Sequence, residues 1–375
     1  MRITVLAVPA LVNFGIHRQL HLNETAVGVL TGLPTLLFSL AAVGGALLIS
    51  RIGARRAVIT GLTLVAVAGA LRGVGPSVAV LFGATLVMGV GISLVQPAFP
   101  VLVGLWSPER IGLATATYST GLLIGEALPP ALTAAVVLPL AGGWPQALAV
   151  WSIPVAFGAV LIAVFTSSGG HDAHGSSRRW WPDWRSSRTW RLGLMLGGDS
   201  ALYWSCNAFI PDFLQHTGRP GLIGPALTAL NAGQIPAAFA IAALPDVLLT
   251  RRAAYLVPGS LLGFGVVAFV ALPGAAPVAV AAGLGFLSAW IFVLALALPP
   301  LIAPRGEVHL LSAAMFTITY LCSFTAPLLG GAAWDLTRFP PAAFLPGLLA
   351  CGLVAAMAAG LRLPSRASLE PIAPT

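Results

Sequence analysis

Long apolar segments separated by short polar breaks run along almost the whole chain. Each is close to or above the roughly 20 residues that an α-helix needs to cross a bilayer. Strands of a membrane barrel would alternate over about ten residues, and these segments do not alternate. The pattern therefore predicts an all-α polytopic membrane protein. The expected spans are 26–49, 57–74, 77–105, 111–138, 145–166, 191–211, 222–248, 253–271, 277–302, 308–331 and 341–362.

Two segments depart from this pattern. Residues 3–15 are apolar but too short to span a bilayer, and 167–190 is a polar and basic linker between two hydrophobic blocks. The expected organisation is therefore an N-terminal helical bundle, a linker, a C-terminal bundle and a tail. The corresponding boundaries are 1–166, 167–190, 191–366 and 367–375.

The composition supports a membrane protein and sets its orientation. Of the residues, 58% are hydrophobic and 8% charged, whereas soluble domains carry about 25% charged residues. The net charge of +8 is spread over the polar breaks, which favours orientation in a membrane over nucleic-acid binding. With the linker inside, fourteen arginines fall in inner segments and four in outer ones. We expect a bacterial plasma-membrane protein with the linker and C-terminus in the cytoplasm.

The two halves share a short pattern at one inner loop. Ser50 is followed by Arg55 and Arg56, and 196 residues later Asp246 is followed by Arg251 and Arg252 at the same spacing. A parallel internal repeat, common among transporters, predicts such an echo.

The segment Gly45–Arg56, which reads GALLISRIGARR, resembles the inner-loop signature of the major facilitator superfamily. Ser50 stands where that signature has an Asp. The resemblance implies a gating role for this loop and its counterpart in the second half. The residues concerned are Arg51, Gly53, Arg55, Arg56, Asp246, Arg251 and Arg252.

Within that superfamily the chain resembles the cyanate and nitroimidazole transporter group. The matching segments are Gly89–Pro100, Leu71–Arg72, Gly112–Thr120, Trp151–Pro154, Tyr203, Phe209–Phe213, Tyr320 and Pro327–Trp334. The resemblance implies two six-helix bundles that move a small anionic or nitro-bearing solute by alternating access. We expect a monomer whose partners are the solute and the lipid bilayer, with protons as a candidate coupling partner and with no cofactor.

The same resemblance places Met1 and Arg2 in register with the middle of the group's first helix, and Leu33 and Pro34 with a later Leu and Pro. On this basis we expect the natural start to lie about 15 to 25 residues upstream, because a spanning helix needs about 20 residues. The first helix would then be incomplete.

Three ionisable residues are expected inside the membrane, where each costs at least about 2.5–3.5 kcal/mol without a partner or a function. Arg2 is a candidate for binding a planar anion through two hydrogen bonds, or else marks an N-terminus at the membrane surface. Glu126 and Asp199 are candidates for proton coupling, with hydrogen bonding to a neighbouring helix as the alternative. For Asp199 a third alternative is that it lies close enough to the inner surface to be hydrated.

Uncharged polar residues on the expected spans complete the candidate site. The substrate-binding candidates, with Arg2, are Gln96, Tyr118, Tyr203 and Asn207, and Asn231 and Gln234 lie on similar spans. For each, a bond between helices worth about 1 kcal/mol is the alternative. Pro97, Pro100, Pro129 and Pro130 are expected to break their helices near the site.

No catalytic constellation is visible, and we expect a protein that is not an enzyme. The chain has no lysine for a phosphate-binding loop, and its histidines and three cysteines show no metal-ligand pattern. Two other functions stay open. Export of hydrophobic drugs would favour an apolar cavity with an acid, and a membrane sensor would bind a solute without moving it.

Overall fold

The computed structural model describes residues 2–11, 16–21, 24–166, 181–244, 246–304, 306–361 and 363. These residues are mainly helical and include no strand. Among them, nine segments are long and apolar enough to cross a membrane. The prediction of an all-α polytopic membrane protein is confirmed.

The helices follow the predicted spans closely. In chain order they are α1 (Arg2–Leu11), α2 (Ile16–Leu20), α3 (Glu24–Ile52), α4 (Ala54–Leu71), α5 (Val78–Trp106), α6 (Ile111–Leu132), the π-helix η2 (Thr133–Val137), α7 (Leu138–Ala141), α8 (Trp144–Val150), α9 (Ile153–Phe165), α10 (Ser187–His216), the short 3-10 helix η3 (Pro220–Leu222), α11 (Ile223–Ala232), α12 (Gln234–Ala243), η4 (Asp246–Thr250), α13 (Ala253–Ala271), α14 (Ala276–Ile302), α15 (Val308–Thr337), η5 (Pro340–Phe344) and α16 (Leu345–Gly360). The predicted spans near 111–138 and 191–211, which fall outside the nine, are nevertheless helical, as α6 and α10.

The chain forms two compact units. Unit 1 comprises Met1–Leu102, Gly121–Pro182 and Arg305–Ala313, and unit 2 comprises Val103–Thr120, Asp183–Pro304 and Ala314–Thr375.

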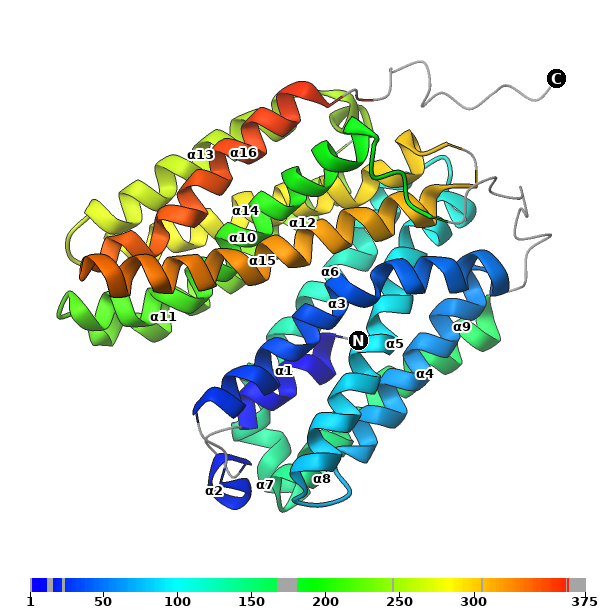
Figure 1. The fold of residues 1–375 in the computed structure, drawn as a ribbon, viewed down its shortest axis with the longest axis horizontal. Helices are drawn as coiled ribbons and strands as arrows, with labels where there is room; N and C mark the ends of the chain where they lie inside the picture. The colour runs from blue at the N-terminus through cyan, green and yellow to red at the C-terminus, as the bar shows by residue number, and fades with distance from the viewer. Residues whose placement is uncertain are drawn as a thin grey trace. The chain divides into compact units, whose positions relative to one another are not determined.

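In unit 1, glycines allow the helices to approach closely. α4 packs along α9 and also contacts α3 and α8 (Figure 1). A Cβ on Gly61 of α4 would lie 2.6 Å from the carbonyl oxygen of Gly91 of α5, and one on Gly91 would lie 2.8 Å from that of Gly61. Real Cβ atoms do not approach that closely, so small residues fix this crossing, as is usual for membrane helices.

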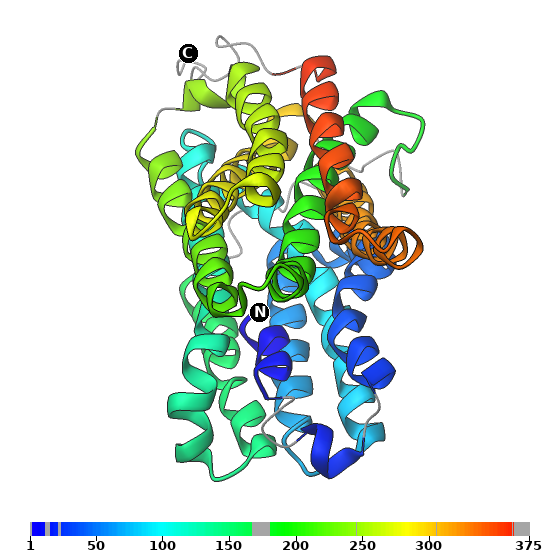
Figure 2. The same ribbon diagram turned by 90° about the vertical axis from the view of Figure 1, so that its left-hand side faces the viewer.

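In unit 2, α10 packs against α16 and α14, and α13 packs against both of these (Figure 1). Figure 2 shows α16, in red, running beside α10, in green. The same reciprocal closeness recurs between α11 and α14: a Cβ on Gly233, at the end of α11, would clash with the carbonyl of Ala282, and one on Gly285 with the carbonyl of Leu230.

The expected helix breaks at four prolines did not occur. α5 continues through Pro97 and Pro100, and α6 continues through Pro129 and Pro130. Pro97 has no N–H to donate to the carbonyl of Ser93, four residues earlier. That carbonyl instead lies against Gly45 of α3, where any Cβ would clash with it. The helix stays intact at this point.

Two irregularities were not predicted at their positions. A π-helix, η2, follows α6 and so lies just beyond Pro129 and Pro130. The predicted span 222–248 is divided at Gly233 into α11 and α12, three residues before Pro236. Pro236 cannot donate to the carbonyl of Ala232, which explains a weakness in the helix at this point.

Candidate functional site

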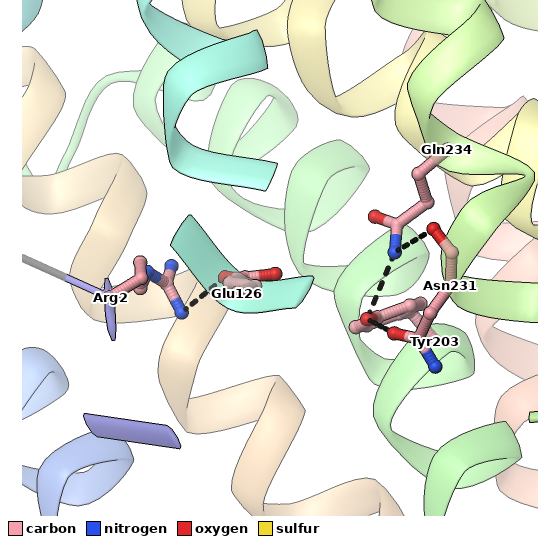
Figure 3. Close-up of polar contacts among 5 residues, drawn as sticks. All are labelled: Arg2, Glu126, Tyr203, Asn231 and Gln234. Atoms are coloured by element: carbon pink, nitrogen blue, oxygen red, sulfur yellow. Dashed lines mark hydrogen bonds and ion pairs between the residues drawn. The ribbon is translucent and has the colours of Figure 1, made fainter. Parts of the chain in front are cut away.

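An ion pair joins α1 to α6 inside unit 1. Nη1 of Arg2 lies 3.1 Å from Oε1 of Glu126, and the two side chains are only 7% and 16% exposed. The guanidinium also lies over the ring of Phe38 of α3, 5.6 Å from its centroid. Figure 3 shows the Arg2 side chain directed toward Glu126.

The electrostatics of this pair follow from its surroundings. A buried arginine is stable only with a counter-charge and a suitable face for its plane, which Glu126 and Phe38 supply. An anion of similar geometry would fit the same guanidinium only if the carboxylate were neutralised by a proton.

A neutral hydrogen-bond network lies in unit 2, between α10 and the break of α11 and α12 (Figure 3). The Tyr203 hydroxyl donates to Oδ1 of Asn231 at 2.6 Å and accepts from Nε2 of Gln234 at 3.0 Å. Nδ2 of Asn231 donates to Oδ1 of Asn207 at 3.1 Å, and Nδ2 of Asn207 donates to the carbonyl of Tyr203 at 2.9 Å. The structure thus brings Tyr203 and Asn207 together, as parts of a network with two further amides.

The other candidates occupy separate positions. Gln96 of α5 is buried in unit 1, and its Oε1 accepts no hydrogen bond from the described residues. Tyr118 of α6 belongs to unit 2, where it lies near Tyr320 of α15.

Asp199 lies in the interior of unit 2. Its side chain is 1% exposed, and it interacts with Ser288 of α14 and Cys351 of α16. Within the described ranges, no cation forms an ion pair with it. A carboxylate in such a place is stable only when it is protonated or binds a cation.

The first half of the predicted gating loop is a tight turn between α3 and α4. Gly53 has a φ of 84°, a left-handed conformation that favours glycine. Arg55 donates to Oγ1 of Thr166 at 2.9 Å and to the carbonyl of Ala163 at 2.8 Å, so it covers the C-terminal end of α9. Arg51 and Arg56 are exposed. Ser50 donates back to Leu47 of its own helix.

The second half of the predicted gating loop lies directly before α13. Asp246 begins η4, and its side chain is outside the described part of the structure. Arg251 and Arg252 are exposed directly before α13 begins at Ala253.

Sequence reasoning missed three residues of the Arg2–Glu126 pair and the Tyr203 network. Phe38 carried no signal, because an apolar residue on a span gives no sign that it faces a cation. Asn231 and Gln234 were noticed as polar residues on a span but not placed with Tyr203. The nearby Gly233 and Pro236 were the available signal, since broken helices often line transporter sites.

A family model agrees with this architecture: residues 3–327 match the model of the Major Facilitator Superfamily. The chain belongs to that superfamily. It is therefore a multi-pass membrane transporter, and the predicted resemblance to this superfamily is confirmed.

The curated relatives narrow the comparison. The chain is 28% identical over 316 residues to the cyanate transport protein CynX of Escherichia coli, covering 83% of this chain and 81% of that protein. It is 32% identical over 198 residues to the 2-nitroimidazole transporter of Escherichia coli, covering 52% of this chain and 49% of that protein. It is 27% identical over 248 residues to the uncharacterized transporter YycB of Bacillus subtilis, covering 64% of this chain and 59% of that protein. The resemblance to the cyanate and nitroimidazole group is confirmed.

Solved structures agree on the fold. The fucose:proton symporter FucP of Escherichia coli has a TM-score of 0.71 at 14% identity, with 97% of each chain covered. The human organic anion transporter MFSD10 has a TM-score of 0.70 at 16% identity, covering 95% of this chain and 96% of that one. At such identities the similarity establishes the fold alone.

Proposed function

We propose that this protein is a secondary active transporter that moves a small anionic or nitro-bearing solute together with a proton. The observation that carries the proposal is the buried ion pair of Arg2 and Glu126. The named solutes of two relatives, cyanate and 2-nitroimidazole, support it. Cyanate is a small anion, and a nitro group carries partial negative charge on two coplanar oxygens, as a carboxylate does.

In this mechanism the solute and Glu126 compete for one guanidinium. Protonation of Glu126 removes its charge and releases Arg2, which then binds the solute through its planar N–H groups. The bound state thus carries one proton and one monovalent anion, and the charge inside unit 1 does not change. The coupling is electroneutral for an anion.

Asp199 is a second candidate for carrying a proton, because it is buried in unit 2 beside Ser288 without a cationic partner in the described residues. The network of Tyr203, Asn207, Asn231 and Gln234 would supply neutral hydrogen-bonding groups for the solute. Gln96 and Tyr118 stay candidates for the same role.

We further propose a monomer in a bacterial plasma membrane, with the linker 167–190 and the C-terminal tail in the cytoplasm. The linker joins an N-terminal bundle, 1–166, to a C-terminal bundle, 191–366. The two arginine-rich inner loops would act in gating as the bundles alternate. Arg55 supports such a role, because its bonds to Thr166 and Ala163 tie the start of α4 to the end of α9.

The test is counterflow and pH-driven uptake of labelled cyanate and 2-nitroimidazole in proteoliposomes. We expect cyanate to accumulate on the alkaline side of a pH gradient, with no response to an imposed membrane potential. Glu126→Gln should abolish the pH-driven uptake and leave solute binding, because the amide cannot take up a proton. The control is Glu109→Gln, which changes an exposed carboxylate.

Each contrary outcome points elsewhere. Unchanged pH dependence in Glu126→Gln removes this residue from coupling. Transport of lipophilic cations in place of both solutes indicates drug export. Binding without any exchange indicates a sensor.

A further inference from the structure

A second arginine is buried in unit 1, and neither the ion pair nor the gating loops account for it. Arg72 directly follows α4, and its side chain is 1% exposed, which makes it one of the most completely buried large side chains of the protein. Its Nη2 donates to the carbonyl oxygen of Thr4 of α1 at 2.7 Å. Arg72 therefore reaches into the interior of unit 1, two residues along α1 from Arg2.

The hydrogen bonds of Arg72 are incomplete. Its Nε and Nη1 are buried, and neither has an acceptor among the described residues. An arginine carries five N–H donors and cannot lose its charge. Buried donors without an acceptor are rare in folded proteins, and they commonly indicate an unseen water or ion.

Among the described residues, the charge of Arg72 also lacks an acidic partner. Unit 1 buries the guanidinium groups of Arg2 and Arg72, and Glu126 is ion-paired with Arg2. No acidic side chain lies within ion-pair distance of Arg72 in the part of the chain that the structure describes. The carbonyl of Thr4 and the end of α4 carry only partial negative charges, so they offset part of this charge.

The donors without an acceptor and the charge without an acidic partner together favour an anion over a water molecule. A water molecule could accept hydrogen bonds from Nε and Nη1, but it would leave the positive charge in place. A monovalent anion satisfies the donors and neutralises the charge together. It must be small, because the backbone beside Arg72 is closely packed. A Cβ on Gly69 of α4 would clash with Oγ of Ser152, and one on Gly73 would lie 2.6 Å from the carbonyl oxygen of Pro145.

We propose that Arg72 binds a small monovalent anion inside unit 1, at a site separate from the ion pair of Arg2 and Glu126. The proposal does not depend on the transport reaction, because it concerns the stability of the folded chain. Chloride and the carried solute anion share the chemistry that this site needs.

The experiment measures the melting temperature of the purified full chain in detergent, in sodium chloride, nitrate, cyanate or gluconate at one ionic strength. Gluconate is too large for the site and serves as the reference. We expect small anions to raise the melting temperature by about 2–4 °C, since a ligand of the folded state stabilises it. In a background that also carries Arg2→Met and Glu126→Met, which removes the proposed solute site, the increment should be lost in Arg72→Met and retained in Arg72→Lys, which keeps the charge.

Two controls isolate the site. The double variant Arg2→Met, Glu126→Met removes the other buried charges and should keep the increment. Arg252→Met removes an exposed arginine and should also keep it. If Arg72→Met does not fold, radiolabelled chloride binding to the Arg2→Met, Glu126→Met variant replaces it, and we expect one displaceable chloride per chain.

Two results would contradict an anion site at Arg72, and a third distinguishes the kind of anion. An increment that persists in Arg72→Met places the anion elsewhere. Equal melting temperatures of the unchanged protein in all four salts, with no chloride retained, leave Arg72 as a tether between α4 and α1 only. In the Arg2→Met, Glu126→Met variant, stabilisation by chloride as well as by nitrate and cyanate indicates a resident inorganic ion, whereas stabilisation by nitrate and cyanate alone indicates a second position of the solute. Failure of cyanate counterflow would overturn the transport proposal and leave this one standing.

Discussion

Arg2 and Glu126 lie in a region from which water is largely excluded, so each determines whether the other is stable there. Removal of one partner leaves a buried charge unpaired, whereas removal of both leaves none. We expect Arg2→Gln and Glu126→Gln each to destabilise the protein more than their combination does, with a coupling free energy of about 1–3 kcal/mol. The melting temperatures of the four proteins in detergent test this.

Glu109 and Arg110 are adjacent in the sequence and both exposed, so they form the matched control for this double-mutant cycle. Their substitutions to Gln should be additive within about 0.5 kcal/mol. Additive effects of Arg2 and Glu126 would show that the 3.1 Å contact contributes no coupling and would weaken the exchange mechanism.

At the residue scale, the sequence predicted which ionisable residues lie inside the membrane better than it predicted which of them pair with each other. Ionisable residues on apolar spans are rare, so Arg2, Glu126 and Asp199 could be selected from the sequence. Which of the two acids pairs with Arg2 depends on how the helices rotate against one another. Hydropathy contains no information on that rotation, so the choice of Glu126 needed the structure.

At the scale of the elements, α11 and α14 cross where glycine is required. A Cβ on Gly285 would clash with the carbonyl of Leu230, and backbone cannot move aside as a flexible side chain can. We expect Gly285→Ala to destabilise the protein by about 1–3 kcal/mol. Because this crossing holds the residues of the Tyr203 network, solute affinity should fall as well. Melting temperature and equilibrium binding measure the two effects.

The same helix offers a matched control. Gly283 of α14 has no atom within 4 Å of an added Cβ, so Gly283→Ala should be neutral or slightly stabilising, as alanine favours helix. Equal effects at Gly283 and Gly285 would mean that helix propensity, and not the crossing, determines the result.

The elements themselves were largely predictable, because the length and apolar character of a span are local properties of the sequence. The irregularities were not. Pro97 leaves α5 intact where Gly45 of α3 lies against the carbonyl that it frees, whereas the chain divides at Gly233 ahead of Pro236. Whether a proline breaks a membrane helix depends on what the neighbouring helix offers the freed carbonyl. The position of the neighbouring helix is set by tertiary packing, so the local sequence does not predict it.

At the scale of the whole molecule, the asymmetric distribution of arginine should determine how the protein lies in the membrane. Positively charged residues in short loops are retained on the cytoplasmic side. The inner loops proposed here include the turns that carry Arg55, Arg251 and Arg252, and the outer loops contain few arginines. This distribution also keeps the gating loops of both halves on one side, as a parallel repeat requires.

We therefore expect opposite accessibility for cysteines placed at two exposed positions in a protein whose native cysteines, Cys206, Cys322 and Cys351, are replaced by Ala. Ala275→Cys lies between α13 and α14, in a proposed outer loop, and Ser187→Cys lies at the end of the linker. An impermeant maleimide should label intact cells at 275 only and should label 187 after permeabilisation. The reverse labelling pattern would mean that the protein has the opposite orientation in the membrane, with both arginine-rich loops outside. The charge argument would then fail, although the helices and the buried ion pair would stand unchanged.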